Sequence, residues 1–334
     1  MAAAGYPDGG FRLLTARYGS NESAREREGS ALASFFDRFS GTVSPAPVGE
    51  LAAAPPGEEA PLSFQLLFPS LLDLNADALT AVLRDHPAAA KASVELVAVA
   101  DVPGAAALVT GDGPPAAVVG LLGWGQHVIK LVGCDAPMPY GPVEVCVGPA
   151  MMAPEFKQEA ARHRAHVLLY YAGTDADPLE QYVALGYAAG ALARFDAVAI
   201  LNEEARAAIP APDLIPDDGE DILKTLRELP LPYLYGGFVR MDAGDPERPW
   251  VRTFANHRLG LPNLARHLGG HNETSHAFRL FAGMLGYLRQ MGETFIAGDE
   301  IDLGGDGKLR MREPTESEWF LDSEDTMLVV EDAK

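Results

Sequence analysis

The chain has 334 residues and a formal charge of −21, because 47 Asp and Glu outnumber 26 Lys and Arg. This charge argues against binding to nucleic-acid backbones and to anionic membrane surfaces, which both require clusters of Lys and Arg. It favours solubility and attraction to a protein partner with a basic surface.

The N-terminus lacks the basic stretch followed by an apolar stretch that marks a secretory signal, and no run of about 18 apolar residues predicts a membrane-spanning helix. Cys134 and Cys146 do not form a C-x2-C pair and are interpreted as reduced, buried thiols. These patterns predict a cytoplasmic protein with no membrane partner.

Residues 1–60 are predicted to form a flexible N-terminal segment that ends in a proline-rich linker. Within it, an apolar stripe at helical spacing predicts a helix over residues 23–39, which either packs on its own domain or serves as a partner-binding arm. The stripe consists of Ala31, Leu32, Phe35, Phe36 and Phe39.

Residues 61–210 are predicted to form a ferredoxin-like α+β part. Apolar runs at 64–68, 94–100, 116–122 and 127–132 predict strands, and Gly123-Trp124-Gly125 predicts a hairpin turn between the last two. Asn75 caps one expected helix, and Asp177-Pro178 begins a second that extends to about Phe195. This second helix lies between buried strands at 166–171 and 197–201, which predicts a split βαβ arrangement.

Residues 211–334 are predicted to form a mixed α/β part. Its expected elements include a long helix over 275–291, a glycine-rich hairpin turn at 304–307 and a last strand at 327–330. The part ends in an acidic segment, 313–332, which contains no Lys or Arg and is typical of a solvated surface. Both parts together predict the α+β fold class.

Four segments of the chain resemble the bacterial domain-of-unknown-function family 4261, mainly over residues 163–332 and more faintly back to residue 64. These segments are His163-Arg-Ala-His-Val-Leu-Leu-Tyr, Ala197-Val-Ala-Ile-Leu, Thr253-Phe-Ala-Asn-His-Arg-Leu-Gly-Leu-Pro-Asn-Leu and Gly298-Asp-Glu-Ile-Asp. The family tends to have a helix around residues 142–147, whereas the β-branched Val143-Glu-Val-Cys-Val locally predicts a strand. The resemblance implies an accessory of a toxin or secretion locus, similar to an immunity protein.

His267, His271 and His276 form the pattern H-x3-H-x4-H, the best candidate metal site in the sequence, with His257 and Glu273 as neighbours. Because two glycines interrupt the pattern, the alternative is a solvated loop that leads into the next helix. His163 and His166, with Glu159, are either metal ligands or structural histidines. No cofactor is predicted, and zinc or another divalent metal is the alternative.

Three tryptophans and three acids are candidate partner-binding residues, because exposed aromatic rings among acids suit a protein interface. They are Trp124, Trp250, Trp319, Glu316, Glu318 and Asp322. The alternative for each tryptophan is a ring packed on the core.

The sequence contains no phosphate-binding loop and no G-x-S-x-G nucleophile elbow. The leading hypothesis is therefore a non-enzymatic intracellular protein-binding factor, such as an immunity or accessory protein of a bacterial toxin or secretion system. One alternative is a metal-dependent enzyme that uses the region of His257, His267, His271 and His276. Another is a structural subunit of a larger assembly.

Overall fold

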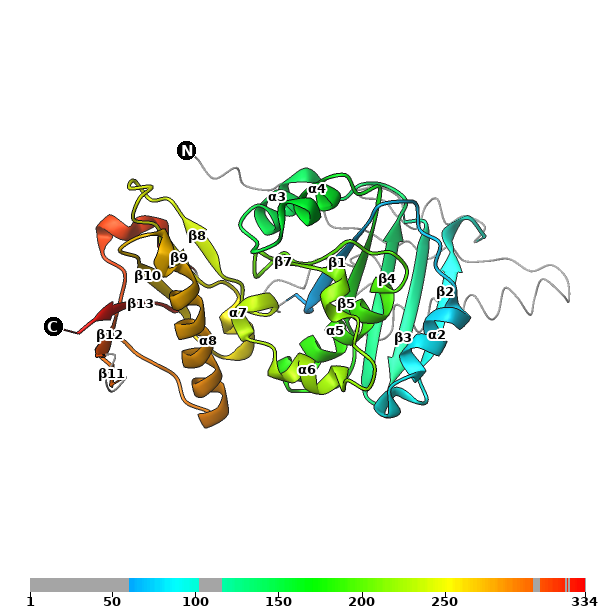
Figure 1. Cartoon of the computed structure of the whole chain (residues 1–334). Helices are drawn as coiled ribbons and strands as arrows, with labels where there is room; N and C mark the ends of the chain where they lie inside the picture. The colour runs from blue at the N-terminus through cyan, green and yellow to red at the C-terminus, as the bar shows by residue number, and fades with distance from the viewer. Residues whose placement is uncertain (1–59, 102–115, 303–306, 322, 324, 334) are drawn as a thin grey trace, which may run out of the picture.

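The structure, a computed structural model, describes residues 60–101, 116–302, 307–321, 323 and 325–333 (Figure 1). The helix predicted over 23–39 and the rest of the N-terminal segment up to residue 59 lie outside the described residues. Two β-sheets lie side by side, one with seven strands and one with six, and helices pack on both. The predicted α+β class is confirmed. The seven-stranded sheet with helices α2 to α7 is called the first lobe, and the six-stranded sheet with helix α8 the second lobe.

The sheet of the first lobe is antiparallel at every neighbouring pair of strands. Its strands, in spatial order, are β2 (Ser93–Ala98), β3 (Val118–Trp124), β4 (His127–Cys134), β5 (Ala165–Tyr171), β1 (Ser63–Phe68), β6 (Ala199–Asn202) and β7 (Ala207–Pro210). Strand β1 lies between β5 and β6, so the connection from β5 to β6 is a split βαβ crossover, as predicted. The sheet is wider than a four-stranded ferredoxin-like unit, because β2, β3 and β4 form a meander at one edge and β7 extends the other.

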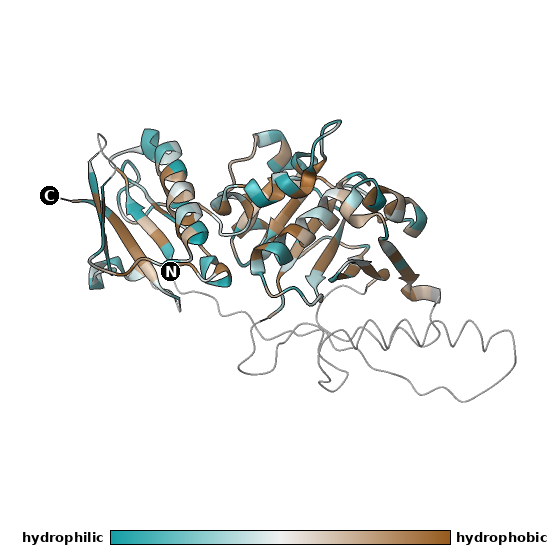
Figure 2. Ribbon diagram, turned by 90° about the horizontal axis from the view of Figure 1, so that it is seen from below, coloured by the Kyte–Doolittle hydropathy of each residue, from teal (hydrophilic) through white to brown (hydrophobic). Residues whose placement is uncertain are grey.

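Helices cover both faces of this sheet, and Figure 2 shows the hydrophobic strands beneath the helical layer. The helix α5 (Pro178–Ala193) is buried over most of its length and packs on the sheet with α2 (Ala76–Arg84) and α6 (Ile222–Glu228). Asn75 and Asp177 cap α2 and α5 as predicted, since each side chain accepts a backbone N–H at 2.9 Å. The opposite face packs against α3 (Tyr140–Val147) and α4 (Pro154–Ala161) through a separate apolar cluster.

The strand predicted at Val143–Val147 is wrong, because this segment forms helix α3. Its buried Val143, Cys146 and Val147 have i, i+3 and i+4 spacing, and the helix packs on β6 and β7. Burial of this stripe outweighs the weak strand preference of the valines.

The sheet of the second lobe is mixed, because β10 and β13 are parallel while its other neighbouring pairs are antiparallel. Its strands, in spatial order, are β11 (Glu300–Asp302), β12 (Lys308–Arg312), β13 (Met327–Asp332), β10 (Asn263–His267), β9 (Trp250–Arg252) and β8 (Val239–Met241). Helix α8 (Thr274–Met291) buries one side of its surface on this sheet. The short helix η8 (Glu316–Leu321) covers part of the other face.

The segment between the two sheets contains α6 and the one-turn helix α7 (Leu231–Leu234). It follows β7, where the sequence predicts the boundary between the two parts. Helix α6 packs on α5, and α7 contacts both β7 and α8, so the lobes share one continuous apolar core. The described residues also contain the 3-10 helices η1 (Pro87–Ala89), η2 (Val99–Asp101), η4 (Ala211–Leu214), η5 (Asn256–Leu259) and η6 (His271–Glu273). Among the described helices, none is long and apolar enough to cross a membrane.

Candidate functional site

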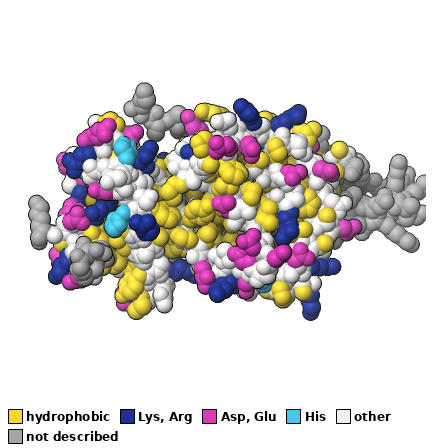
Figure 3. Space-filling model, in the orientation of Figure 1, with side chains coloured by type: hydrophobic (Ala, Val, Ile, Leu, Met, Phe, Trp, Pro, Cys, Tyr) yellow, Lys and Arg dark blue, Asp and Glu magenta, His cyan; other side chains and the backbone are white. Residues whose placement is uncertain are grey.

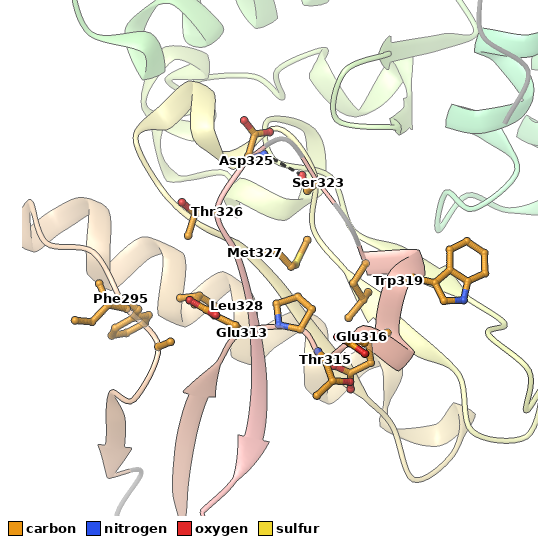
Figure 4. A pocket seen from close by; sticks show the side chains of 15 residues that line it. Phe295, Glu313, Thr315, Glu316, Trp319, Ser323, Asp325, Thr326, Met327 and Leu328 are labelled. Carbon is orange, nitrogen blue, oxygen red and sulfur yellow. Dashed lines mark hydrogen bonds between the residues drawn. The ribbon is translucent and has the colours of Figure 1, made fainter.

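A groove with a volume of ≈ 760 Å³ opens on the second lobe, between the loop that follows α8 and the helix η8 (Figure 4). Its walls come from residues 295–297, 313–316, 318–319, 321, 323 and 325–328. Figure 4 shows Phe295 on one side of β13, and Trp319 projecting from η8 on the other. We call this feature the acidic groove, because Glu313, Glu316, Glu318 and Asp325 line it.

The helix η8 is held at its start by one half of a capping box, in which the side chain of Glu318 accepts the backbone N–H of Thr315. The backbone N–H of Thr315 donates to Oε2 of Glu318 at 2.8 Å, and the backbone N–H of Glu318 donates to the carbonyl of Thr315 at 2.9 Å. Arg312 on β12 donates to both carboxylate oxygens of Glu318, each at 2.7 Å, and to Oε2 of Glu331 at 2.9 Å. These bonds from Arg312 lower the pKa of Glu318.

Trp319 is the most exposed aromatic side chain of this region, with 73% of its surface accessible. The next residues of η8 face inward: Phe320 packs edge-on against Trp250 at 5.6 Å, and Leu321 is buried. Across the groove, Ile296 is 64% exposed. The groove therefore presents apolar side chains to solvent from two separate segments of the chain.

The acids of the groove differ in their partners. Glu318 is neutralised by Arg312, so it organises η8 instead of offering a free charge. Within the described part of the chain, no ion pair engages Glu313 or Glu316, and both are exposed. Asp322, which the sequence also predicts as a partner-binding residue, lies outside the described residues. Glu313 and Glu316 thus remain available to attract a basic group.

Trp124 and Trp250 do not belong to an exposed surface, and the prediction that they present their rings to a partner is wrong. Trp124 is 6% exposed, because strand alternation turns it toward the core, where it meets Tyr187 at 5.5 Å. Trp250 is 7% exposed and stacks on His267, with the ring centroids 5.0 Å apart. Trp319 is exposed as expected, and its role in partner binding stays a prediction.

The three histidines of the predicted metal site have separate partners. His267 lies on Trp250, with its Nε2 3.0 Å from the carbonyl of Arg248, and Nδ1 of His271 lies 3.3 Å from a guanidinium nitrogen of Arg240. His276 is exposed in the first turn of α8. Over residues 60–101, 116–302, 307–321 and 325–333, no three His, Cys, Asp or Glu side chains are placed to hold a metal ion.

His257 lies between the two lobes, within reach of two carboxylates. Its Nε2 is 3.2 Å from Glu204, in the turn between β6 and β7, and its Nδ1 is 2.8 Å from Asp325, just before β13. The contact between Nδ1 and Asp325 is short, but its geometry is not that of a hydrogen bond. A neutral imidazole carries one N–H, so only the protonated ring can pair with both acids.

His163 and His166 have structural roles in the first lobe. The backbone N–H of Met138 donates to Nε2 of His163 at 2.7 Å, so its Nδ1 carries the hydrogen and donates to the carbonyl of Ala160 at 2.6 Å. Nδ1 of His166 lies 2.7 Å from the carbonyl of Ala136. Burial lowers the pKa of both histidines, which favours the neutral rings.

The two thiols are buried and lack activation. Burial raises the pKa of Cys134 to about 11 and that of Cys146 to about 12. Because the thiolate is the reactive form, neither thiol has the properties of a catalytic nucleophile.

The sequence predicts Trp319, Glu316 and Glu318 of this groove but contains no signal for Phe295 and Ile296 on its opposite wall. The pattern Thr315-x-x-Glu318 is a capping-box signal that could have predicted η8. No local pattern indicates that the loop after α8 reaches η8.

No protein-family model matches the chain, and neither the curated proteins nor the solved structures give a significant match.

Proposed function

We propose that this protein is a non-enzymatic binding factor whose acidic groove receives a basic, partly apolar segment of a partner protein. The observation that carries the proposal is Trp319, whose 73% exposed ring projects from η8 at the edge of the groove that Glu313 and Glu316 line (Figure 4). Trp is strongly enriched among the residues that dominate binding energy at protein interfaces. The resemblance noted in the sequence extends the proposal to an immunity or accessory role in a bacterial toxin or secretion system.

Burial of Trp319 and attraction by the acids would contribute in different ways. Covering about 150 Å² of a Trp ring is worth about 4 kcal/mol of transfer free energy at about 25 cal/mol per Å², before the costs of association. The exposed Glu313 and Glu316 would mainly raise the association rate, and salt would screen their effect. Affinity would therefore depend on the ring, and salt sensitivity on the acids.

The proposal is tested with synthetic peptides and the full-length protein. The probes are 15-residue peptides with Lys and Arg around a central Leu or Phe, and matched peptides with Glu and Asp in place of the basic residues. We expect the basic set to bind with 1:1 stoichiometry and to weaken as salt increases. A double variant, Glu313→Gln with Glu316→Gln, should slow association several-fold.

A matched control is Glu155→Gln with Glu159→Gln on α4, which removes the same charge from exposed positions of the first lobe. It should leave the association rate nearly unchanged. Equal binding of basic and acidic peptides, or equal slowing by the two double variants, would contradict the role of the groove.

A further inference from the structure

The N-terminal segment joins the described fold beside the acidic groove. The guanidinium group of Arg258, in η5, donates a hydrogen bond to the carbonyl of Ala60, the first described residue. The neighbouring residue His257 lies 2.8 Å from Asp325, which lines the groove and stands just before β13 (Figure 4). Residues 1–59 are therefore tethered to the fold at a point close to the groove.

One stretch of this segment has the composition that the groove favours. Residues 9–21 contain Arg12 and Arg17 and no Asp or Glu, although the whole chain has a net charge of −21. Apolar side chains surround the two arginines, namely Phe11, Leu13, Leu14, Ala16 and Tyr18. We call residues 11–18 the basic stretch. It is basic and partly apolar, which is the kind of ligand proposed above for the groove.

The groove offers groups that match both properties of the basic stretch. Glu313 and Glu316 are exposed, and no ion pair engages them in the part of the chain that the structure describes. Ile296 and Trp319 expose apolar surface from two separate segments of its wall. The two arginines of the stretch can therefore face two acids while its apolar side chains cover apolar surface that is otherwise in contact with water.

The length of the connection does not limit this contact. Residues 19–59 separate the basic stretch from Ala60, and at about 3.3 Å per residue they span more than about 100 Å when extended. A flexible linker, such as the sequence predicts here, gives a tethered ligand an effective concentration of about 1 mM. A contact with a dissociation constant of about 1 mM is then populated in about half of the molecules, and a tighter contact in most of them.

We propose that the basic stretch occupies the acidic groove of its own chain and competes there with the partner protein. The inference rests on the proposed function, because the acids and apolar side chains that would receive the partner also receive the stretch. A partner binds only the molecules whose groove is open, so its apparent affinity is reduced in proportion to their fraction. With the stretch in place in about two-thirds of the molecules, the reduction is about threefold.

Chemical coupling in the full-length protein tests the contact directly. The variant Arg12→Lys with Arg17→Lys keeps both charges and provides primary amines that a carbodiimide joins to carboxylates in contact with them. We expect peptide mass spectrometry to find position 12 or 17 joined to Glu313 or Glu316, in protein that migrates as a monomer. Equal coupling to the exposed Glu155 on α4, or coupling found only in dimers, would overturn the proposal.

Competition is measured with the basic 15-residue peptides described above. Arg12→Gln with Arg17→Gln removes the charges of the basic stretch, so this variant should bind the peptide about threefold more tightly than the wild type at low salt. The difference should disappear at high salt, which screens the contact in the wild type. The matched control is Arg25→Gln with Arg27→Gln, which removes the same charge where arginines alternate with glutamates, and it should bind the peptide like the wild type.

The outcomes separate this inference from the proposed function. Equal affinity of the wild type and of Arg12→Gln with Arg17→Gln for the peptide would overturn the competition and leave the groove as a partner-binding site. Binding of the peptide to neither protein would refute the proposed function, and the competition with it. Tighter binding by the variant, together with coupling to Glu313 or Glu316 within one chain, would support both.

Discussion

Glu318→Gln is the substitution that most directly tests how the wall of the acidic groove is built. The carboxylate of Glu318 accepts two charge-assisted bonds from Arg312 and one from the backbone N–H of Thr315. The side chains of Glu318 and Arg312 are 13% and 27% exposed, so solvent screens the pair only in part. Hydrogen bonds to charged groups are worth about 1.5–3 kcal/mol each, and Gln keeps some of them.

We therefore expect Glu318→Gln to lower the free energy of unfolding of the protein by about 2 kcal/mol, or its melting temperature by about 4–8 °C. Urea denaturation and calorimetry measure both quantities. The control is Glu228→Gln, which removes the exposed pair between Lys224 and Glu228, where the charged atoms are 3.9 Å apart and both side chains are about two-thirds exposed. It should change the free energy by no more than about 0.5 kcal/mol.

The effect of Glu318→Gln should also depend on pH. The bonds from Arg312 lower the pKa of Glu318 in the folded state, so its stabilising effect is complete above the unfolded pKa of about 4.3. The effect is lost as the pH falls through the lower folded pKa. Equal losses for Glu318→Gln and Glu228→Gln at neutral pH would refute this account of the groove wall.

Three further results follow from the same geometry. Gly237→Ala should prevent normal folding, because its Cβ would overlap a backbone oxygen, and the effect would be seen as loss of soluble protein or of the cooperative melting transition. The control is Gly219→Ala, which has open space around its Cβ and should lower the free energy of unfolding by about 1 kcal/mol. A mild effect of Gly237→Ala would contradict the close contact. Cys134 and Cys146 should react with a thiol reagent at pH 8 only after unfolding, because burial raises the pKa of each thiol; rapid reaction of the native protein would contradict their burial. Trp319→Phe should remove most of the fluorescence that acrylamide quenches, since the other two tryptophans are buried, and unchanged quenching would contradict the exposure of Trp319.

The elements that sequence reasoning predicted best are those whose signals are local. The apolar strand at 166–171 and the Asp177-Pro178 helix start both appear in the structure, because burial on both faces and capping depend on adjacent residues. The split βαβ crossover follows from the order of these elements. The number of strands in the sheet does not follow from this order, because strand pairing at the sheet edges depends on segments that are distant in the sequence.

The errors have physical causes that single residues illustrate. Val143 and Val147 favour a strand locally, yet with Cys146 they form the buried stripe of α3. Trp124 ends a strand at a hairpin, where the sequence favours exposure, but the alternation of side chains turns the ring inward onto Tyr187. At both positions tertiary packing determines where the side chain lies, and no local sequence pattern indicates this packing.

The candidate site was partly predictable for the same reason. Trp319 and Glu316 lie in an acidic segment that the sequence marks as a surface. Ile296, on the opposite wall, reaches the groove only because the chain folds back after α8. The contacts of Arg206 and Arg252 with the ring of Phe254 join residues that are 46 positions apart, and they have no signal in the sequence either.

The central claim, that the acidic groove is a protein-binding surface, is tested most directly by comparing two alanine variants in binding to a basic peptide. Trp319 and Tyr140 have nearly the same exposure, 73% and 74%, but Tyr140 lies on α3 in the first lobe. If Trp319 is the main anchor, Trp319→Ala should weaken binding at least about 30-fold, which corresponds to about 2 kcal/mol. Tyr140→Ala should change the affinity less than about twofold. Equal effects of the two substitutions, or none from Trp319→Ala, would contradict the claim.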